Sequence, residues 1–161
     1  MTILIIDDEP GLRRSLTAHL EDQEFDTLEA ANGQEGLDAL LAHRQEVQAV
    51  VVDLNMPVMD GYSFIQHAVA EVPEVPIIVL SGVGIVEDAL SAMRVGAWDF
   101  ITKPLHNLDI LDYTLRKVFD RARLVRENRA YQENLERLVR ERTAELEETR
   151  RQVMHRLSRA A

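Results

Sequence analysis

Four short apolar runs mark the first two thirds of this chain, and each leads into a residue with a carboxylate, hydroxyl or ammonium side chain. The runs are of strand length and are separated by amphipathic stretches, a pattern typical of a parallel sheet covered by helices on both faces. They occupy residues 3–6, 50–52, 77–80 and 100–102, and they lead into Asp7-Asp8, Asp53, Ser81 and Lys103. Because parallel strands end at one edge of their sheet, we expect three carboxylates, a hydroxyl and an ammonium group to meet there.

The same pattern predicts five strand–helix units. Strands are expected at residues 2–7, 25–30, 48–53, 76–81 and 98–102. Helices are expected at residues 10–22, 33–43, 62–71, 85–95 and, for the last one, from about 107 to 156. The sequence therefore predicts an α/β fold, in which a five-stranded parallel sheet is flanked by helices and followed by a long C-terminal helix.

Charge is distributed unevenly along the 161 residues, whose net charge is −10. Residues 1–116 contain 6 Lys and Arg against 20 Asp and Glu, a net charge of −14, whereas residues 117–161 contain 12 against 8, a net charge of +4. An acidic body repels nucleic acid, so we expect no direct nucleic-acid binding. The change of charge favours a globular domain over residues 1–120 and a helical coiled-coil extension, continuous with the fifth helix, over residues 121–161.

Composition excludes several other classes of protein. The chain has no cysteine, so neither a disulfide framework nor a thiolate metal site is possible. Its apolar runs are far shorter than the roughly 20 residues of a membrane span. The first run lacks a preceding basic region and is too short for a signal peptide. We therefore expect a soluble cytoplasmic protein without membrane contacts.

Five motifs resemble those of the receiver domain of two-component response regulators. They are Asp-Asp-Glu-Pro at 7–10, Val-Asp-Leu-Asn-Met-Pro-Val-Met-Asp-Gly at 52–61, Leu-Ser-Gly at 80–82, Gly-Ala-Trp-Asp-Phe at 96–100 and Thr-Lys-Pro at 102–104. The resemblance covers residues 1–120 without a gap and implies a flavodoxin-like sheet with strand order 2-1-3-4-5. Within these motifs, Gly61 and Gly82 are expected to adopt positive φ angles.

The resemblance implies that Asp53 accepts a phosphoryl group from a sensor histidine kinase or a small phosphodonor. It makes Asp8 and Asp53 direct ligands of Mg²⁺, with Mn²⁺ as a possible substitute; Asp7 acts partly through water, and the backbone carbonyl of Asn55 completes the protein's ligands. The residues themselves support a cation, because carboxylates about 4 Å apart repel by roughly 4 kcal/mol per pair at an effective dielectric constant near 20. An oxygen cluster of this kind suits Mg²⁺.

Lys103 and Ser81 are expected to contact the phosphoryl oxygens, the first through its charge and the second through a hydrogen bond. By resemblance, Ser81 and Phe100 are also switch residues: the aromatic ring turns inward when Ser81 engages the phosphate, and the face made by the fourth helix, fifth strand and fifth helix changes. An ordinary strand residue packed under the fourth helix is an equally good interpretation of Phe100. The resemblance further implies a cis peptide bond between Lys103 and Pro104.

The C-terminal region predicts a coiled coil. A helix over residues 107–156 would be about 75 Å long, too long to lie on a body with a radius of gyration near 13 Å. A protruding helix is stabilised chiefly by a partner helix, which favours a homodimer over a solvated monomeric extension. Apolar residues recur at heptad-like spacings: Val118, Ala122, Val125, Leu135, Val139, Leu146 and Val153. The polar stretch at 128–132 indicates a stutter in this pattern.

Two further resemblances concern the region C-terminal to the receiver. Residues 131–148 resemble the signalling coils that join receivers to output domains, and residues 151–161 resemble the first helix of an HD-GYP phosphohydrolase domain. We therefore expect either a fragment of a longer regulator or a receiver–coil product, with an unknown output domain or partner. The chain itself is not expected to be an enzyme beyond accepting phosphate and removing it, although a separate output domain could be an HD-GYP-type phosphodiesterase.

Two alternative functions remain open from the sequence. A haloacid-dehalogenase-like phosphatase also uses an aspartate nucleophile and Mg²⁺, but that family places its nucleophile in an Asp-x-Asp motif, whereas Asp7 and Asp8 are adjacent. A receiver-like structural dimerisation module is disfavoured by the complete set of acidic residues. Nucleotide binding has little support, since no Gly-x-Gly-x-x-Gly motif follows the first strand.

Overall fold

The computed structural model describes residues 1–82 and 86–160, which form strands and helices in strict alternation. The strands are β1 (Thr2–Ile6), β2 (Asp26–Ala30), β3 (Val47–Asp53), β4 (Ile77–Ser81) and β5 (Asp99–Thr102). The helices are α1 (Pro10–Asp22), α2 (Gly33–Ala42), α3 (Gly61–Glu71), α4 (Val86–Val95) and α5 (Asp109–Ala160). The chain divides into one compact unit from Met1 to Ala122 and a second unit from Arg123 onward.

The five strands form one parallel sheet in the order β2-β1-β3-β4-β5, which confirms the predicted fold class. The register pairs Ile6 with Val52 and Asp53 with Leu80. β1 and β3 are therefore neighbours whose carboxyl ends lie at the same level of the sheet. The first polar residue after each of these apolar runs consequently emerges at a common edge.

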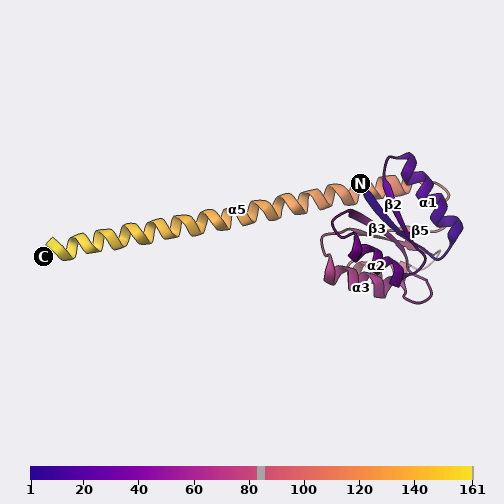
Figure 1. Cartoon of the computed structure of the whole chain (residues 1–161), viewed down its shortest axis with the longest axis horizontal. Helices are drawn as coiled ribbons and strands as arrows, with labels where there is room; N and C mark the ends of the chain where they lie inside the picture. Colours follow the sequence, from indigo (N-terminus) through magenta and orange to yellow (C-terminus); the bar gives the residue numbers. More distant parts are fainter. Residues whose placement is uncertain (83–85, 161) are drawn as a thin grey trace. The chain divides into compact units, whose positions relative to one another are not determined.

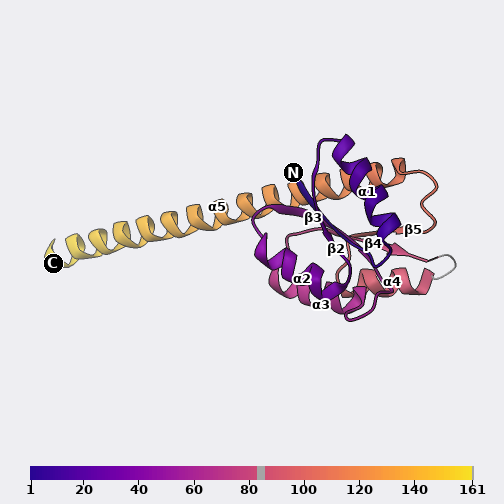
Figure 2. The same cartoon turned by 45° about the vertical axis from the view of Figure 1, so that its right-hand side comes forward.

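The sheet separates two apolar clusters within the first unit, because successive side chains of a strand point to opposite faces. Ile3 and Ile5 of β1 pack in the cluster formed with α1 and the first part of α5, whereas Leu4 and Ile6 pack in the cluster formed with α2, α3 and α4. In Figures 1 and 2, α1 lies on one side of the sheet and α2 and α3 lie on the other. Burial on both faces explains why the central strands β1, β3 and β4 carry continuous apolar runs, whereas the edge strands β2 and β5 are more polar and partly exposed.

Local capping interactions set where the helices begin. Asn32 caps α2 by accepting a hydrogen bond from the backbone N–H of Glu35 at 2.9 Å, and the Glu35 carboxylate accepts one in return from the N–H of Ala31 at 3.0 Å. Asp60 caps α3 through the N–H of Ser63 at 2.8 Å. Helix α1 starts with Pro10, whose fixed φ angle suits the first helical position.

Several predicted boundaries were wrong by one to four residues. α5 begins at Asp109 rather than 107, because the side chain of Asn107 accepts a hydrogen bond from the N–H of Asp109 at 2.8 Å, and it continues to Ala160 rather than 156. β4 begins after Pro76, which has no N–H for the ladder. The predicted start of the fourth helix at residue 85 lies outside the described residues.

The remaining differences are one-residue shifts at element ends. Among the strands, β1 ends at residue 6 instead of 7, β2 starts at 26 instead of 25, β3 starts at 47 instead of 48, and β5 starts at 99 instead of 98. Among the helices, α2 ends at 42 instead of 43, and α3 starts at 61 instead of 62. Helix 3, for example, starts earlier because Asp60 is its cap. Sequence periodicity does not resolve such end effects.

The described residues of the second unit form one helical stretch in which every side chain is solvent-exposed. Its ion pairs lie within the helix, as between Arg129 and Glu133 at 3.2 Å and between Arg137 and Glu141 at 2.8 Å. Exposed pairs of this kind contribute about 0.3–0.5 kcal/mol each, too little to hold an isolated helix firmly. Within residues 1–82 and 86–160, no helix combines the length and apolarity needed to cross a membrane.

Phe64→Ala should lower the free energy of unfolding of the first unit by about 3–5 kcal/mol, because it leaves a cavity under α3 where a fully buried ring packs against the sheet. Urea unfolding followed by the fluorescence of Trp98, the single tryptophan, measures this change. Leu90→Ala on α4 is the matched control, since Leu90 is 48% exposed and its truncation should have a far smaller effect. Equal losses for the two variants would contradict the assignment of Phe64 to the core.

Candidate functional site

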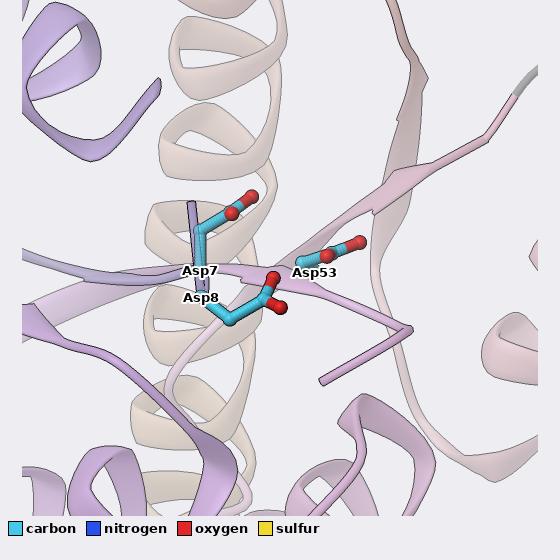
Figure 3. A group of neighbouring side chains, drawn as sticks. All are labelled: Asp7, Asp8 and Asp53. Atoms are coloured by element: carbon cyan, nitrogen blue, oxygen red, sulfur yellow. The ribbon is translucent and has the colours of Figure 1, made fainter. Parts of the chain in front are cut away.

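Three carboxylates meet at the carboxyl ends of β1 and β3. Asp7, Asp8 and Asp53 each offer one oxygen, and these oxygens all lie within 4.8 Å of one another. Figure 3 shows Asp7 and Asp8 leaving consecutive positions of one chain segment, with Asp53 across from them on the neighbouring strand. Asp7 is fully buried and Asp53 is 6% exposed, whereas Asp8 is open to solvent. The predicted convergence of these three residues is therefore present.

Asp7 is held from two sides. One carboxylate oxygen accepts a hydrogen bond from the backbone N–H of Glu9 at 2.8 Å, and the other accepts one from Nζ of Lys103 at 2.9 Å. The backbone N–H of Asp7 donates to the carbonyl of Ala30 on β2 at 3.1 Å. A buried carboxylate is tolerated where it is paired and hydrogen-bonded in this way.

Lys103 places its ammonium group between two carboxylates. Nζ lies 2.9 Å from Asp7 and 3.4 Å from an oxygen of Asp53. Burial by itself would lower the pKa of Lys103, but the hydrogen bond to Asp7 and the charges of Asp7 and Asp53 outweigh it and raise the pKa above its usual range. The lysine is therefore a permanent cation at this edge, and its backbone N–H also donates to the carbonyl of Ser81 at 2.7 Å.

The pKa of Asp53 is raised, chiefly by burial. The charge of Lys103 acts against this shift, the charge of Asp7 adds to it, and a hydrogen bond with the backbone of Asn55 again lowers the pKa. The net upward direction shows that Lys103 does not fully compensate the burial and the mutual repulsion of the carboxylates. A hard divalent cation with oxygen ligands would supply the missing positive charge, so the residues present fit Mg²⁺ or Mn²⁺.

The other predicted site residues belong to β4, to β5 and to the loop that follows β3. Ser81 is 3% exposed at the end of β4, paired with Thr102 of β5 in the register. Asn55 follows β3 in an exposed position. Phe100 is 38% exposed, so it does not pack as a buried strand residue. The peptide bond between Lys103 and Pro104 is cis.

Gly61 serves the site for a reason that differs from the predicted one. Its φ angle lies outside the left-handed region, so the expectation of a positive φ was wrong. A Cβ at this position would lie 2.4 Å from the backbone oxygen of Asp53 and 2.8 Å from Cα of Leu54. The absence of a side chain thus lets α3 start directly against the end of β3, and the N–H of Gly61 donates to the carbonyl of Leu54 at 2.9 Å.

Two neighbouring features were not predicted from the sequence. Nη1 of Arg13, on the second turn of α1, donates to the carbonyl oxygen of Asp7 at 2.7 Å. In the loop between β3 and α3, Val58 has a φ angle of 69°, and the N–H of Met59 donates to the carbonyl of Pro57 at 2.8 Å. This i to i+2 hydrogen bond around a positive φ angle is a γ-turn, an uncommon conformation for a β-branched residue.

Comparison with known proteins agrees with the geometry. The response regulator receiver domain model matches residues 3–116 of the chain. An NtrX-like response regulator of Rickettsia felis is 35% identical over 130 residues, which are 80% of this chain and 27% of that protein. The transcriptional regulator ycf27 of Porphyridium aerugineum is 38% identical over 119 residues, covering 74% of this chain and 48% of that protein.

A solved structure shows the same fold. The crystal structure of a response regulator receiver domain protein from Clostridium thermocellum superposes with a TM-score of 0.72 at 27% identity, covering 77% of this chain and 98% of that one. The chain spans about a quarter of the length of the Rickettsia relative and about half of the Porphyridium relative. The similarity therefore concerns the receiver part of those proteins.

Asp53→Asn should raise the free energy of unfolding at pH 7 in the presence of EDTA, because it removes a buried carboxylate whose ionisation opposes folding. The folded-state pKa of Asp53 lies above its unfolded value. At pH values above the folded-state pKa, ionisation of Asp53 therefore lowers the free energy of unfolding of the wild type by its full amount. This penalty disappears as the pH falls through that pKa toward the unfolded value. The gain from the substitution should therefore shrink as the pH is lowered through this window.

Urea unfolding at a series of pH values measures this difference. Glu74→Gln, which neutralises an exposed loop carboxylate in the same unit, is the control and should leave the free energy of unfolding nearly unchanged. If Asp53→Asn were neutral or destabilising throughout, the carboxylate cluster would not be under electrostatic strain.

Proposed function

The chain belongs to the family of response regulator receiver domains, and from this membership we propose that it accepts a phosphoryl group on Asp53 and transmits the resulting change to α5. The observation that carries the proposal is a nearly buried carboxylate beside a protonated lysine and two further carboxylates, all at the carboxyl edge of the sheet. The donor is a sensor histidine kinase or a small phosphodonor. The protein acts in the cytoplasm, and its output domain or partner is unknown.

In the proposed reaction, an oxygen of Asp53 attacks the donor phosphorus in line with the leaving group. A new P–O bond forms, the bond from phosphorus to the donor nitrogen or oxygen breaks, and the leaving group keeps the electron pair. Lys103 stays protonated and attracts the phosphoryl oxygens, and Ser81 donates a hydrogen bond to one of them. Lys103 and Ser81 orient the phosphoryl group, and neither residue transfers a proton in this step.

Asp8, Asp53 and the backbone carbonyl of Asn55 would hold Mg²⁺ or Mn²⁺ directly, and Asp7 would contribute partly through water. A bound divalent cation supplies neutralising charge for the phosphoryl oxygens. The fit rests on the oxygen donors of the cluster and on the raised pKa of Asp53, which reports an excess of negative charge and burial. The haloacid-dehalogenase alternative is not proposed, because the family model that matches residues 3–116 is that of the receiver domain.

The switch in this proposal links Ser81 and Phe100 to α5. When Ser81 engages the phosphoryl group, the exposed ring of Phe100 turns inward. The strand that carries Phe100 is tied to α5 by an ion pair between Asp99 and Lys117. Trp98, the residue before this strand, also contacts α5, since the guanidinium group of Arg121 lies 4.6 Å from the centroid of its ring. A displacement of β5 therefore has direct contacts through which to move the first part of α5.

The second unit carries the signal as a parallel homodimeric coiled coil in this proposal. Val125, Val139, Leu146 and Val153 follow one another at multiples of seven residues, and each is at least half exposed in the single chain. A partner helix would cover this apolar seam, which surface ion pairs alone cannot stabilise. Two receivers joined through such a coil would reach effective local concentrations in roughly the millimolar range.

Incubation with acetyl phosphate and Mg²⁺ should give one phosphoryl adduct per chain on Asp53, detected by intact-protein and peptide mass spectrometry. Asp53→Asn should abolish the adduct, and Asp8→Ala should reduce its rate by weakening Mg²⁺ binding. Asp22→Asn, an exposed carboxylate at the end of α1, is the control and should label normally. Undiminished labelling of Asp53→Asn would falsify the assignment of the acceptor.

Addition of a beryllofluoride phosphate mimic with Mg²⁺ should shift NMR signals beyond the carboxylate cluster. We expect changes at Ser81, in α4, at residues 100–103 and in the first turns of α5, because these segments form the connected path from the site. Phe100→Ala should keep the shifts at Asp53 and reduce those in α5. Shifts confined to the immediate neighbours of Asp53 would contradict the proposed switch.

The full chain should be dimeric at tens of micromolar by light scattering, and a chain shortened after Ala122 should be largely monomeric. Leu146→Lys should also give monomers, because it places a charge in the apolar seam. Glu147→Lys introduces the same residue one position away, on a different side of the helix, and should leave the dimer intact. A dimer of equal strength in the shortened chain would show that the second unit is not the dimerisation element.

A further inference from the structure

The guanidinium group of Arg13 makes a contact that the phosphoryl-acceptor mechanism does not use. Arg13 lies in α1, where its backbone N–H donates to the carbonyl of Glu9 at 3.1 Å. Its side chain turns back to the end of β1, and Nη1 donates to the carbonyl oxygen of Asp7 at 2.7 Å in a partly buried position. Through this hydrogen bond, α1 is connected to the peptide group that joins Asp7 to Asp8.

The three carboxylates of the cluster differ in how they are held. Asp7 is fixed by Glu9 and Lys103, and Asp53 by Lys103 and the backbone of Asn55. Asp8 has an exposed side chain that makes no hydrogen bond or ion pair with the part of the chain that the structure describes. Its direction must therefore come from the backbone that carries it.

We propose that Arg13 is a positioning residue that aims the Asp8 carboxylate at the divalent cation by holding the peptide group between Asp7 and Asp8. The peptide group is planar, so a hydrogen bond to its carbonyl oxygen restrains the N–H and Cα of Asp8 as well. Without this restraint the plane can rotate and carry the Asp8 side chain away from Asp53. The inference rests on the proposed function, because it concerns the same cation.

Charge and positioning predict opposite effects for the loss of Arg13. A positive guanidinium group near three carboxylates repels an incoming cation, so its removal would tighten cation binding if charge alone mattered. Loss of a group that orients a metal ligand instead weakens binding, typically by about 10–100-fold. The direction of the change in Mg²⁺ affinity therefore distinguishes the two roles.

Isothermal titration of the full chain with MgCl₂ tests the proposal. Arg13→Gln should raise the dissociation constant for Mg²⁺ by about tenfold. Arg13→Lys keeps the charge but offers a shorter point donor, and it should weaken binding to a similar degree. Arg14→Gln is the matched control: Arg14 is exposed, makes no hydrogen bond or ion pair within residues 1–82 and 86–160, and its substitution removes the same charge one position away. Circular dichroism establishes that each variant is folded.

A double-mutant cycle with Asp8→Ala identifies the residue through which Arg13 acts. If Arg13 positions Asp8, Arg13→Gln should weaken Mg²⁺ binding no further once Asp8 is alanine. Equal or tighter binding by Arg13→Gln, or full additivity of the two substitutions, overturns the inference while leaving Asp53 labelling and the proposed function intact. Failure of the wild-type chain to bind Mg²⁺ overturns both the inference and the proposed function. If the wild-type chain binds Mg²⁺ and only the Arg13 and Asp8 variants bind it more weakly, but Asp53 is not labelled, the proposed function alone is overturned.

Discussion

The interaction of Lys103 with Asp7 and Asp53 is the constraint on which the rest of the site depends. Two nearly buried carboxylates at the ends of neighbouring strands would repel each other strongly, and the ammonium group 2.9 and 3.4 Å from them makes their burial tolerable. The compensation is incomplete, since the pKa of Asp53 remains raised. The uncompensated negative charge at this edge of the sheet favours binding of a cation. In the absence of a cation, the same negative charge lowers the free energy of unfolding.

The sheet order explains how residues almost a hundred positions apart reach one edge. β3 lies between β1 and β4, so Asp53 emerges between the segment that carries Asp7 and Asp8 and the strand that ends in Ser81. Lys103 follows β5 and bridges back to Asp7 across this arrangement. Close packing completes the geometry, because α3 can begin beside Asp53 only where Gly61 has no side chain.

The sequence predicts those parts of the molecule that depend on simple periodicity or on strand ends. The apolar runs predict the strands because both faces of the sheet are covered, and the residues that follow them predict the gathering of Asp7, Asp8, Asp53 and Lys103. The role of Arg13 is not predictable in this way, because a long side chain on an amphipathic helix can point to solvent or fold back to the backbone with equal ease. The start of α5 likewise depends on a single side-chain hydrogen bond at Asn107.

The continuity of α5 gives the contacts on β5 their significance. Within the first unit, Leu111, Leu115 and Val118 anchor this helix in the core, while Asp99 and Trp98 hold it through Lys117 and Arg121. Sharp kinks in helices occur mostly at proline or glycine, and neither residue occurs in the sequence between 109 and 160. A displacement of β5 therefore acts directly on the turns of α5 that these contacts hold, between Leu111 and Arg121.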